Sequence, residues 1–140
     1  RFFSTEWEVL RDREYLWIQK KGSSQLIPEL IIEEIERTPS FVIPRDKHIA
    51  CLDADQLIHP LTIRKWGKGD KFVPLGMNGK KKVSDYLTDK KFSLFQKENQ
   101  YVVCCGEDIV WLVNERSDHR YRITDSTRRI LIIQIKKDGQ

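Results

Sequence analysis

The C-terminal part of the sequence alternates short strand-like runs with polar turns, and this pattern restricts the chain to a β-rich fold. The four runs are Tyr101–Cys105, Ile109–Val113, Arg120–Thr124 and Arg129–Ile135. Apolar and β-branched residues at such regular intervals are typical of small all-β domains. With one short helix upstream, they predict a mainly β fold with minor α content, built as a small sandwich or barrel.

Further strands are predicted nearer the N-terminus. Trp7–Leu10 and Tyr15–Lys20 flank a polar turn and together predict a hairpin, and Ile49–Leu52 predicts a separate strand. The segment Leu26–Ile35 fits either one face of a helix or a strand, but its β-branched residues and Pro28 favour a strand.

The segment Leu61–Trp66 alternates apolar and polar positions. In a strand, Leu61 and Ile63 would face a core, whereas Arg64 and Trp66 would share the outer face. The sequence therefore predicts an outward aromatic ring beside a cation. Downstream, the apolar spacing within Lys82–Thr88 predicts one short amphipathic helix.

A chain of 140 residues with 39% apolar residues fits one compact domain, or one domain with an appended piece. We divide it into a β-rich preceding segment or subdomain, 1–48, and a C-terminal domain, 49–140. No apolar run approaches the roughly 18 residues of a membrane span, and the N-terminus lacks the pattern of a signal peptide. A cytoplasmic location without a membrane partner is expected. The first residue is Arg1, so we expect a piece of a longer or processed polypeptide.

The sequence contains no motif of a known catalytic centre: no nucleophile elbow, no His-Glu-x-x-His, and no Gly-x-Gly-x-x-Gly. Gly67-Lys68-Gly69-Asp70 resembles a phosphate-binding loop but lacks its spacing. The three cysteines have no zinc-binding spacing, and the three histidines are isolated from one another; these residues are Cys51, Cys104, Cys105, His48, His59 and His119. We expect no catalytic residue, metal or cofactor in this chain.

Positive charge is concentrated in one segment. Residues 64–97 carry ten Lys and Arg against three Asp and Glu, whereas residues 1–63 carry eight against eleven and residues 98–140 carry seven against seven. Aromatic residues interrupt this basic segment at Trp66, Phe72, Tyr86 and Phe92. Lysines that neutralise phosphates and aromatic rings that stack on bases are typical of RNA-binding surfaces. On composition alone, a solvated lysine-rich face of a β-domain is an equal alternative.

The order of residues in and after the basic segment resembles the C-terminal domain of bacterial tRNA(Ile)-lysidine synthetase. The resemblance covers roughly Ile49 to Ile133 and rests on Arg64, Trp66, Gly69-Asp70-Lys71-Phe72, Pro74, Gly76, Lys81-Lys82-Val83-Ser84-Asp85, Gly106, Ile109-Val110-Trp111, Val113 and Arg116. Lys71 stands where the family more often has Arg, and Asn114 where it usually has Gly. Asn tolerates a left-handed turn almost as Gly does, so the second change is compatible with the fold.

The resemblance implies a fold like that of this domain, which is also found in the phenylalanyl-tRNA synthetase β chain. It implies an enzyme that uses ATP, with Mg²⁺, to join lysine to the wobble cytidine of tRNA(Ile). Its ATP-binding Ser-Gly-Gly-x-Asp-Ser motif is absent here, so catalysis is expected in a separate N-terminal domain of the same polypeptide. This chain would then be the accessory part that binds tRNA at the acceptor stem.

The residues expected to contact RNA are the cations of the basic segment and a second set near the C-terminus. They are Arg64, Lys68, Lys71, Lys80, Lys81 and Lys82, followed by Lys90, Lys91, Arg116, Arg120 and Arg122. Loop-shaping roles are assigned to Gly69, Asp70, Pro74 and Gly76, and core positions to Val83, Leu87, Val110 and Trp111. The alternative is a protein-interaction or intramolecular docking domain whose basic face meets an acidic protein surface and no RNA. No oligomeric state follows from the sequence.

Overall fold

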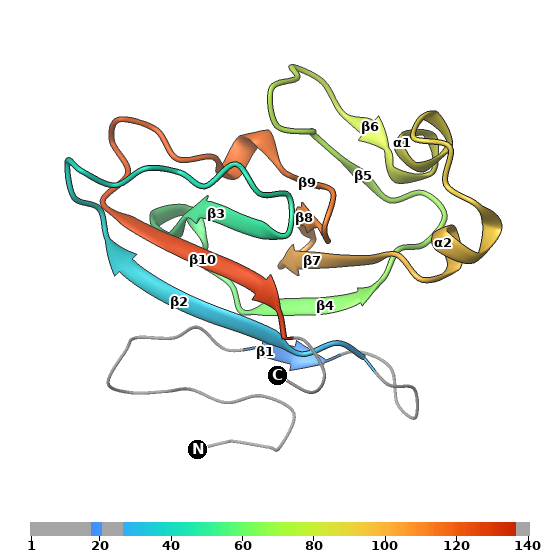
Figure 1. Cartoon of the computed structure of the whole chain (residues 1–140), viewed down its shortest axis with the longest axis horizontal. Helices are drawn as coiled ribbons and strands as arrows, with labels where there is room; N and C mark the ends of the chain where they lie inside the picture. Colours follow the sequence, from blue (N-terminus) through green and yellow to red (C-terminus); the bar gives the residue numbers. More distant parts are fainter. Residues whose placement is uncertain (1–17, 21–26, 137–140) are drawn as a thin grey trace.

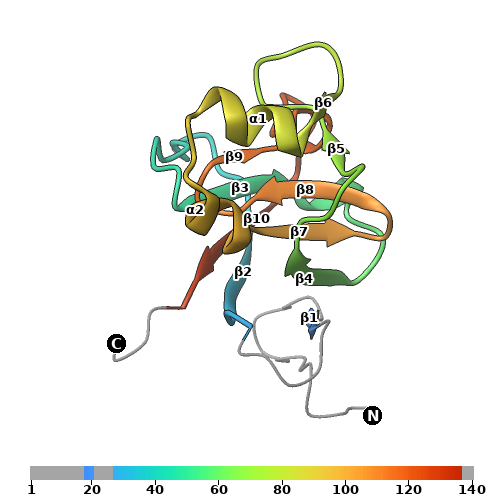
Figure 2. The ribbon, with the colours of Figure 1, turned by 90° about the vertical axis from the view of Figure 1, so that its right-hand side faces the viewer.

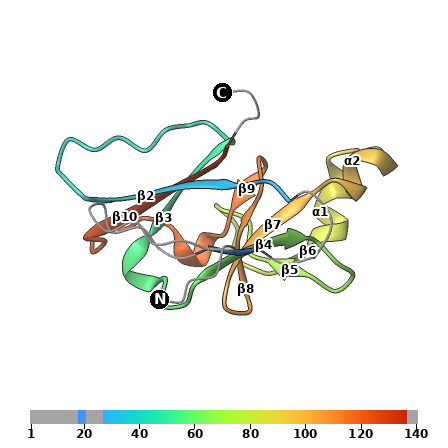
Figure 3. The same cartoon turned by 90° about the horizontal axis from the view of Figure 1, so that it is seen from below.

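The computed structural model describes residues 18–20 and 27–136. Two β-sheets pack face to face, and two short helices with a small hairpin lie at one end of the molecule (Figure 1). The turn that precedes the last strand lies at the other end, as Figure 3 also shows. Within the described part of the chain, no helix is long and apolar enough to cross a membrane.

The larger sheet has five strands in the order β1-β4-β7-β8-β9. Its strands are β1 (Ile18–Lys20), β4 (Leu61–Lys65), β7 (Tyr101–Cys105), β8 (Asp108–Leu112) and β9 (Arg116–Ser117). The β1–β4 pair is parallel and the other pairs are antiparallel. The tight turns that join β7, β8 and β9 contain Gly106 at φ 63° and Asn114 at φ 63°. The left-handed conformation expected for Asn114 is therefore confirmed.

The smaller sheet has three antiparallel strands in the order β2-β10-β3. These are β2 (Leu30–Glu36), β3 (Ile49–Asp53) and β10 (Arg129–Ile135). A 3₁₀ turn, Ala54–Gln56, follows β3, and the Asp53 carboxylate begins it by accepting a hydrogen bond from the Asp55 N–H. The strand preferred for Leu26–Ile35 is confirmed from Leu30 onward, as β2, and Leu26 lies outside the described residues.

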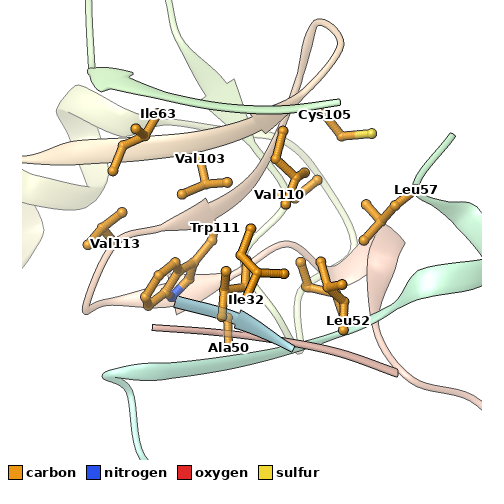
Figure 4. Packing of buried hydrophobic residues seen from close by; sticks show 13 residues of the cluster. Ile32, Ala50, Leu52, Leu57, Ile63, Val103, Cys105, Val110, Trp111 and Val113 are labelled. Atoms are coloured by element: carbon orange, nitrogen blue, oxygen red, sulfur yellow. The ribbon is translucent and has the colours of Figure 1, made fainter. Parts of the chain in front are cut away.

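The main core lies between the two sheets. Ile32 of β2 and Ala50 of β3 face Val103 of β7 and Trp111 of β8, and each of the four is at most 4% exposed (Figure 4). Trp111 is the largest of the fully buried side chains. Burial of this kind stabilises a fold by about 25 cal/mol for each Å² of apolar surface removed from water.

The outer face of the larger sheet carries a second core, covered by α1 (Val83–Asp89). Val102 and Cys104 point to this side, whereas Val103 and Cys105 point to the first core. The two neighbouring cysteines thus point to opposite faces of the sheet, as alternation along a strand requires. Figure 2 shows α1 beside the hairpin of β5 (Lys71–Phe72) and β6 (Lys81–Lys82).

A shift of one residue in the register of β7 and β8 supports both cores. Val103 pairs with Trp111, but the next residue, Cys104, pairs with Ile109. Val110 is thus the extra residue of a β-bulge. Because of it, Val110 and its neighbour Trp111 both reach the first core, which strict alternation would forbid.

Two predictions of local structure are wrong. Arg120–Thr124 is not a strand, because the Asp118 carboxylate accepts a hydrogen bond from the Arg120 N–H and a 3₁₀ turn, His119–Tyr121, forms instead. A second helix, α2 (Leu94–Glu98), was not expected. The predicted Trp7–Leu10 strand lies outside the described residues, and the division into 1–48 and 49–140 stays a prediction.

Candidate nucleic-acid interface

The β5–β6 hairpin places two lysines directly opposite each other. Lys71 pairs with Lys82, and Phe72 pairs with Lys81. Phe72 is fully buried against Tyr86 of α1, with ring centroids 5.7 Å apart. Since neighbouring residues in a strand point to opposite faces, Lys71 points away from α1. Lys82, its cross-strand partner, lies on the same face of the hairpin as Lys71. Both side chains are exposed.

Lys68 and Lys80 are the exposed lysines that flank this pair, one before each strand. No ion pair within the described part of the chain involves these two or the cross-strand pair. Like charges placed directly opposite across two strands repel one another. The hairpin therefore presents uncompensated positive charge that an anion would stabilise.

Backbone and side-chain bonds hold the loop between β5 and β6 on the rest of the domain. The Val73 N–H donates to Asp118 Oδ2 at 2.9 Å, and the Val73 carbonyl accepts from the His119 N–H at 2.6 Å. The Gly76 N–H donates to His119 Nδ1 at 3.0 Å. Gly76 has φ 93°, a conformation that favours glycine. The lysines at the two ends of this loop thus project from a fixed frame.

Arg64 forms its ion pair within the domain, with Asp70 of the loop between β4 and β5. Its guanidinium donates to both oxygens of Asp70, at 2.8 and 3.1 Å, and Asp70 also accepts from the Gly67 N–H at 2.8 Å. Burial raises the pKa of Asp70, but the hydrogen bonds from Arg64 and Gly67 outweigh it and hold that pKa below its usual value. The loop passes directly into β5 rather than into a helix.

The arginines predicted near the C-terminus also bond to the protein. Arg120 forms an ion pair with the fully buried carboxylate of Asp118 at 3.0 Å. Arg122 Nη1 donates to the His119 carbonyl, and Arg116 Nη1 donates to the Leu75 carbonyl. Their guanidinium groups therefore brace the turn and the loop that carry the hairpin.

The remaining predicted cations lie on or beside α1. Lys81 forms an ion pair with Asp89 at 2.6 Å. Lys90 Nζ lies 5.7 Å from the centroid of the Tyr86 ring, a cation–π distance. Lys91 is exposed, with φ 61°. RNA contact by any of the eleven predicted cations stays a prediction, but the structure separates the exposed lysines from those already paired.

The expected outward aromatic residues are instead part of the second core. Phe72 and Tyr86 are buried in it, and Trp66 and Phe92 pack against it. The Trp66 indole N–H donates to the Lys97 carbonyl at 2.7 Å, which turns the ring onto α2 rather than outward. Trp66 lies on the outer face of the larger sheet, as predicted, but its ring is half-buried against the second core and does not project into solvent.

The exposed aromatic ring of this region, Phe95 on α2, was missed. One signal in the sequence could have revealed its helix. Ser93 and Gln96 form a capping box, in which each side chain accepts a hydrogen bond from the other residue's backbone N–H. Ser-x-x-Gln is a recognisable helix start.

Two other features of the described residues bear on other kinds of site. Among residues 18–20 and 27–136, no cluster of three His, Cys, Asp or Glu side chains could hold a metal ion. A cleft of about 780 Å³ lies at the end of the smaller sheet, remote from the hairpin. Its lining mixes Arg37, Arg128 and Arg129 with Glu36 and Asp125, so its charges largely offset one another.

The chain is similar in sequence to tRNA(Ile)-lysidine synthases. It is 53% identical over 138 residues to that of Bacteroides thetaiotaomicron, a match that covers 96% of this chain and 32% of the relative. It is 43% identical over 146 residues to that of Parabacteroides distasonis, covering 94% of this chain and 33% of the relative. The chain thus spans about a third of the length of the curated relatives it matches. No family model matches it.

Two solved structures share the fold. The crystal structure of the TILS C-terminal domain aligns with a TM-score of 0.66 at 19% identity, over 79% of this chain and 85% of that one. An N-terminal fragment of the phenylalanyl-tRNA synthetase β-subunit from Pyrococcus horikoshii aligns with a TM-score of 0.54 at 17% identity, over 62% of this chain and 27% of that one.

These likenesses define a class of small, mainly β domains that occurs in both proteins, as the sequence resemblance implied. Within that class, the chain belongs to the tRNA(Ile)-lysidine synthase family and matches the C-terminal domain. It is an accessory domain of that enzyme.

Proposed function

We propose that this domain binds tRNA through the exposed lysines of the β5–β6 hairpin. The observation that carries the proposal is the cross-strand pair Lys71 and Lys82, two exposed lysines directly opposite each other, neither of which forms an ion pair with a described carboxylate. Lys68 and Lys80 extend this positive surface at its edges. We call these four residues the hairpin lysines.

The physical basis is the release of counterions from a phosphate backbone. Each ammonium that neutralises a phosphate frees condensed cations, which favours binding in a salt-dependent manner. Repulsion between Lys71 and Lys82 is present in the free protein and is relieved when an anion approaches both. An A-form stem offers rows of phosphates and a shallow minor groove to such a surface without being opened, so the acceptor stem of tRNA fits the proposal.

The role of the whole polypeptide is also a proposal. Under this proposal, an N-terminal catalytic domain of the polypeptide uses ATP and Mg²⁺ to join lysine to the wobble cytidine of tRNA(Ile), in the cytoplasm. The domain described here holds the same tRNA at a distance from that reaction. The relatives' names support the reaction. The division into two parts is supported by the matched region, which is only about a third of the relatives' length.

The test compares two variants that lose positive charge at different places. One replaces all four hairpin lysines with Gln. The control replaces Arg128 and Lys136, which flank β10 in the other sheet, with Gln. At low salt, four contacts of about 0.5 to 1 kcal/mol each predict at least a thirtyfold loss of tRNA affinity in the first variant.

Fluorescence polarisation with labelled tRNA measures both affinities, and circular dichroism confirms that both variants are folded. The tRNA affinity of the control is expected to fall by less than about threefold, because only the long-range electrostatic attraction to tRNA changes. Equal affinities for the wild type and the hairpin variant would contradict the proposal. They would favour the alternative, in which the basic face docks on an acidic protein surface.

A further inference from the structure

We propose that Phe95, together with Leu94, forms a stacking platform for an unpaired base or for the terminal base pair at an open end of the bound RNA stem. This inference rests on the proposed function and extends it from the phosphates to the bases. It assigns the stacking role to α2, since the aromatic residues of the preceding segment are occupied in the core.

The two side chains are unusually exposed for their type. Leu94 is 73% exposed and Phe95 is 74% exposed. Among the large apolar side chains that the structure describes as exposed, Phe95 carries the one aromatic ring. Isolated exposed apolar residues are common on protein surfaces, so exposure alone would not indicate a site.

The rigidity of α2 is the second observation. The capping box of Ser93 and Gln96 fixes its start, and Asn99 Nδ2 donates to the Phe95 carbonyl at 2.8 Å at its end. Lys97 joins the helix to the body in two ways. Its carbonyl accepts the Trp66 indole N–H, and its ammonium donates to Thr88 Oγ1 at 3.2 Å.

This helix has only five residues, too few to be stable without such bonds. The contacts therefore fix the backbone that carries the exposed ring before any partner arrives. A rigid aromatic side chain loses little conformational freedom on binding, which favours affinity.

Charge points to the occupant. Lys90 and Lys91 lie at the turn immediately before α2 and Lys97 lies within it, so residues 89–98 carry three lysines against Asp89 and Glu98. Figures 1 and 2 place α2 at the same end of the molecule as α1 and the hairpin. An exposed aromatic ring at the same end of the molecule as the exposed hairpin lysines complements a nucleotide, which combines an aromatic face with a phosphate.

The geometry of RNA then restricts where stacking can occur. In a continuous stem, the faces of the bases are covered by their neighbours above and below. A free face exists at the end of the stem or at an unpaired nucleotide. Phe95 is therefore expected to contact an end, while the hairpin lysines contact the phosphates of the stem beside it.

The test uses two RNA stems of the same paired sequence. One is open at one end and carries a single-stranded 3′ extension whose first base is 2-aminopurine. The other is closed at both ends by a covalent linker that contains no base, so it offers neither an open end nor an unpaired nucleotide. Base–aromatic stacking is worth about 1 to 3 kcal/mol, so the wild type is expected to bind the open stem about tenfold more tightly. Stacking is also expected to quench the 2-aminopurine fluorescence.

Two variants and a control isolate the contribution of the ring. Phe95→Ser is expected to lose the preference for the open stem and the quenching, with unchanged affinity for the closed stem. Phe95→Trp is expected to retain both. Val42→Ser, at an 80% exposed position in the loop between β2 and β3, is the matched control and is expected to behave as the wild type.

The outcomes separate this inference from the proposed function. If Phe95→Ser keeps the full preference for the open stem, or if the wild type shows none, the platform is wrong while RNA binding stands. If the wild type binds neither RNA, both proposals fail. If Phe95→Ser instead abolishes a concentration-dependent dimer in sedimentation and leaves RNA binding unchanged, the patch is a contact between two copies, and the inference is overturned.

Discussion

Arg64 grips Asp70 with both of its terminal nitrogens, at 2.8 and 3.1 Å, and so closes the loop between β4 and β5. Arg64 is 34% exposed and Asp70 19% exposed, so solvent screens the pair only in part. Asp70→Asn removes the charge and weakens both bonds. We expect it to lower the free energy of unfolding by about 1 to 2 kcal/mol, measured by urea titration.

A substitution of the other partner, Arg64→Gln, distinguishes two roles for Arg64. If Arg64 acts on the loop alone, Arg64→Gln lowers stability by a similar amount and reduces tRNA affinity far less than loss of Lys71 and Lys82. A stable Arg64→Gln variant with strongly reduced affinity would instead show direct contact with RNA. That result would restore the role predicted from the sequence.

The Asp70 carboxyl makes stability depend on pH in a defined direction. Its pKa is held below the usual value, so the folded protein binds this proton more weakly than the unfolded chain. Its contribution is therefore complete above the ordinary Asp pKa of about 3.9 and is lost as pH falls through the folded value. We expect the stability difference between the wild type and Asp70→Asn to shrink below about pH 4. A difference that stays constant to lower pH would contradict this cause.

The buried carboxylate of Asp118 organises the turn behind the hairpin. It accepts hydrogen bonds from the Val73 N–H and the Arg120 N–H, and it pairs with the Arg120 guanidinium. Asp118→Ala leaves two backbone donors without their acceptor and leaves Arg120 with only its longer ion pair to Asp108, at 3.6 Å. We expect a loss of about 3 to 5 kcal/mol in thermal or urea unfolding, the range for breaking a buried pair.

A double-mutant cycle tests whether Arg120 stabilises the Asp118 carboxylate. Arg120→Ala is expected to cost less on its own, because its side chain is 34% exposed, and the two effects are expected to be non-additive. Strictly additive effects would mean that Arg120 does not stabilise Asp118 and is free for another role.

Cys104 and Cys105 provide a chemical probe of the two cores, and Cys51 provides one of the half-buried face of β3. Burial raises the pKa of the Cys51 thiol to about 11 and also raises the pKa of Cys104 and Cys105. Because the thiolate is the reactive form, we expect very slow reaction with Ellman's reagent in the native protein at pH 8. All three thiols are expected to react quickly after unfolding in urea. Rapid labelling of the native protein would contradict the packing around them.

Local patterns in the sequence were enough to predict a strand where its side chains alternate regularly between the core and the outer face or form an apolar run. The alternation in Leu61–Lys65 and the apolar run of Arg129–Ile135 predicted β4 and β10. Burial of Val83, Leu87, Val110 and Trp111 was also predicted correctly. In these segments, propensity and tertiary packing favour the same structure.

Local patterns failed where a distant contact decides the conformation. Trp66 continues the alternation of β4, but its indole N–H bonds to the carbonyl of Lys97. The strand predicted for Arg120–Thr124 is replaced by a turn that the Asp118 side chain caps. The composition was enough to identify the basic segment. The ion pair of Lys81 with Asp89 could be identified only from the folded structure. Which cations are free therefore could not be predicted.

The most direct test of the central claim is the salt dependence of tRNA binding by the variant Lys71→Gln/Lys82→Gln. If both ammonium groups neutralise a phosphate, the slope of log affinity against log salt falls in magnitude by about 1.4 to 1.8 relative to the wild type. The control, Arg128→Gln/Lys136→Gln, is expected to keep the wild-type slope. Identical slopes for the wild type and the Lys71/Lys82 variant would contradict the claim that this cross-strand pair binds RNA.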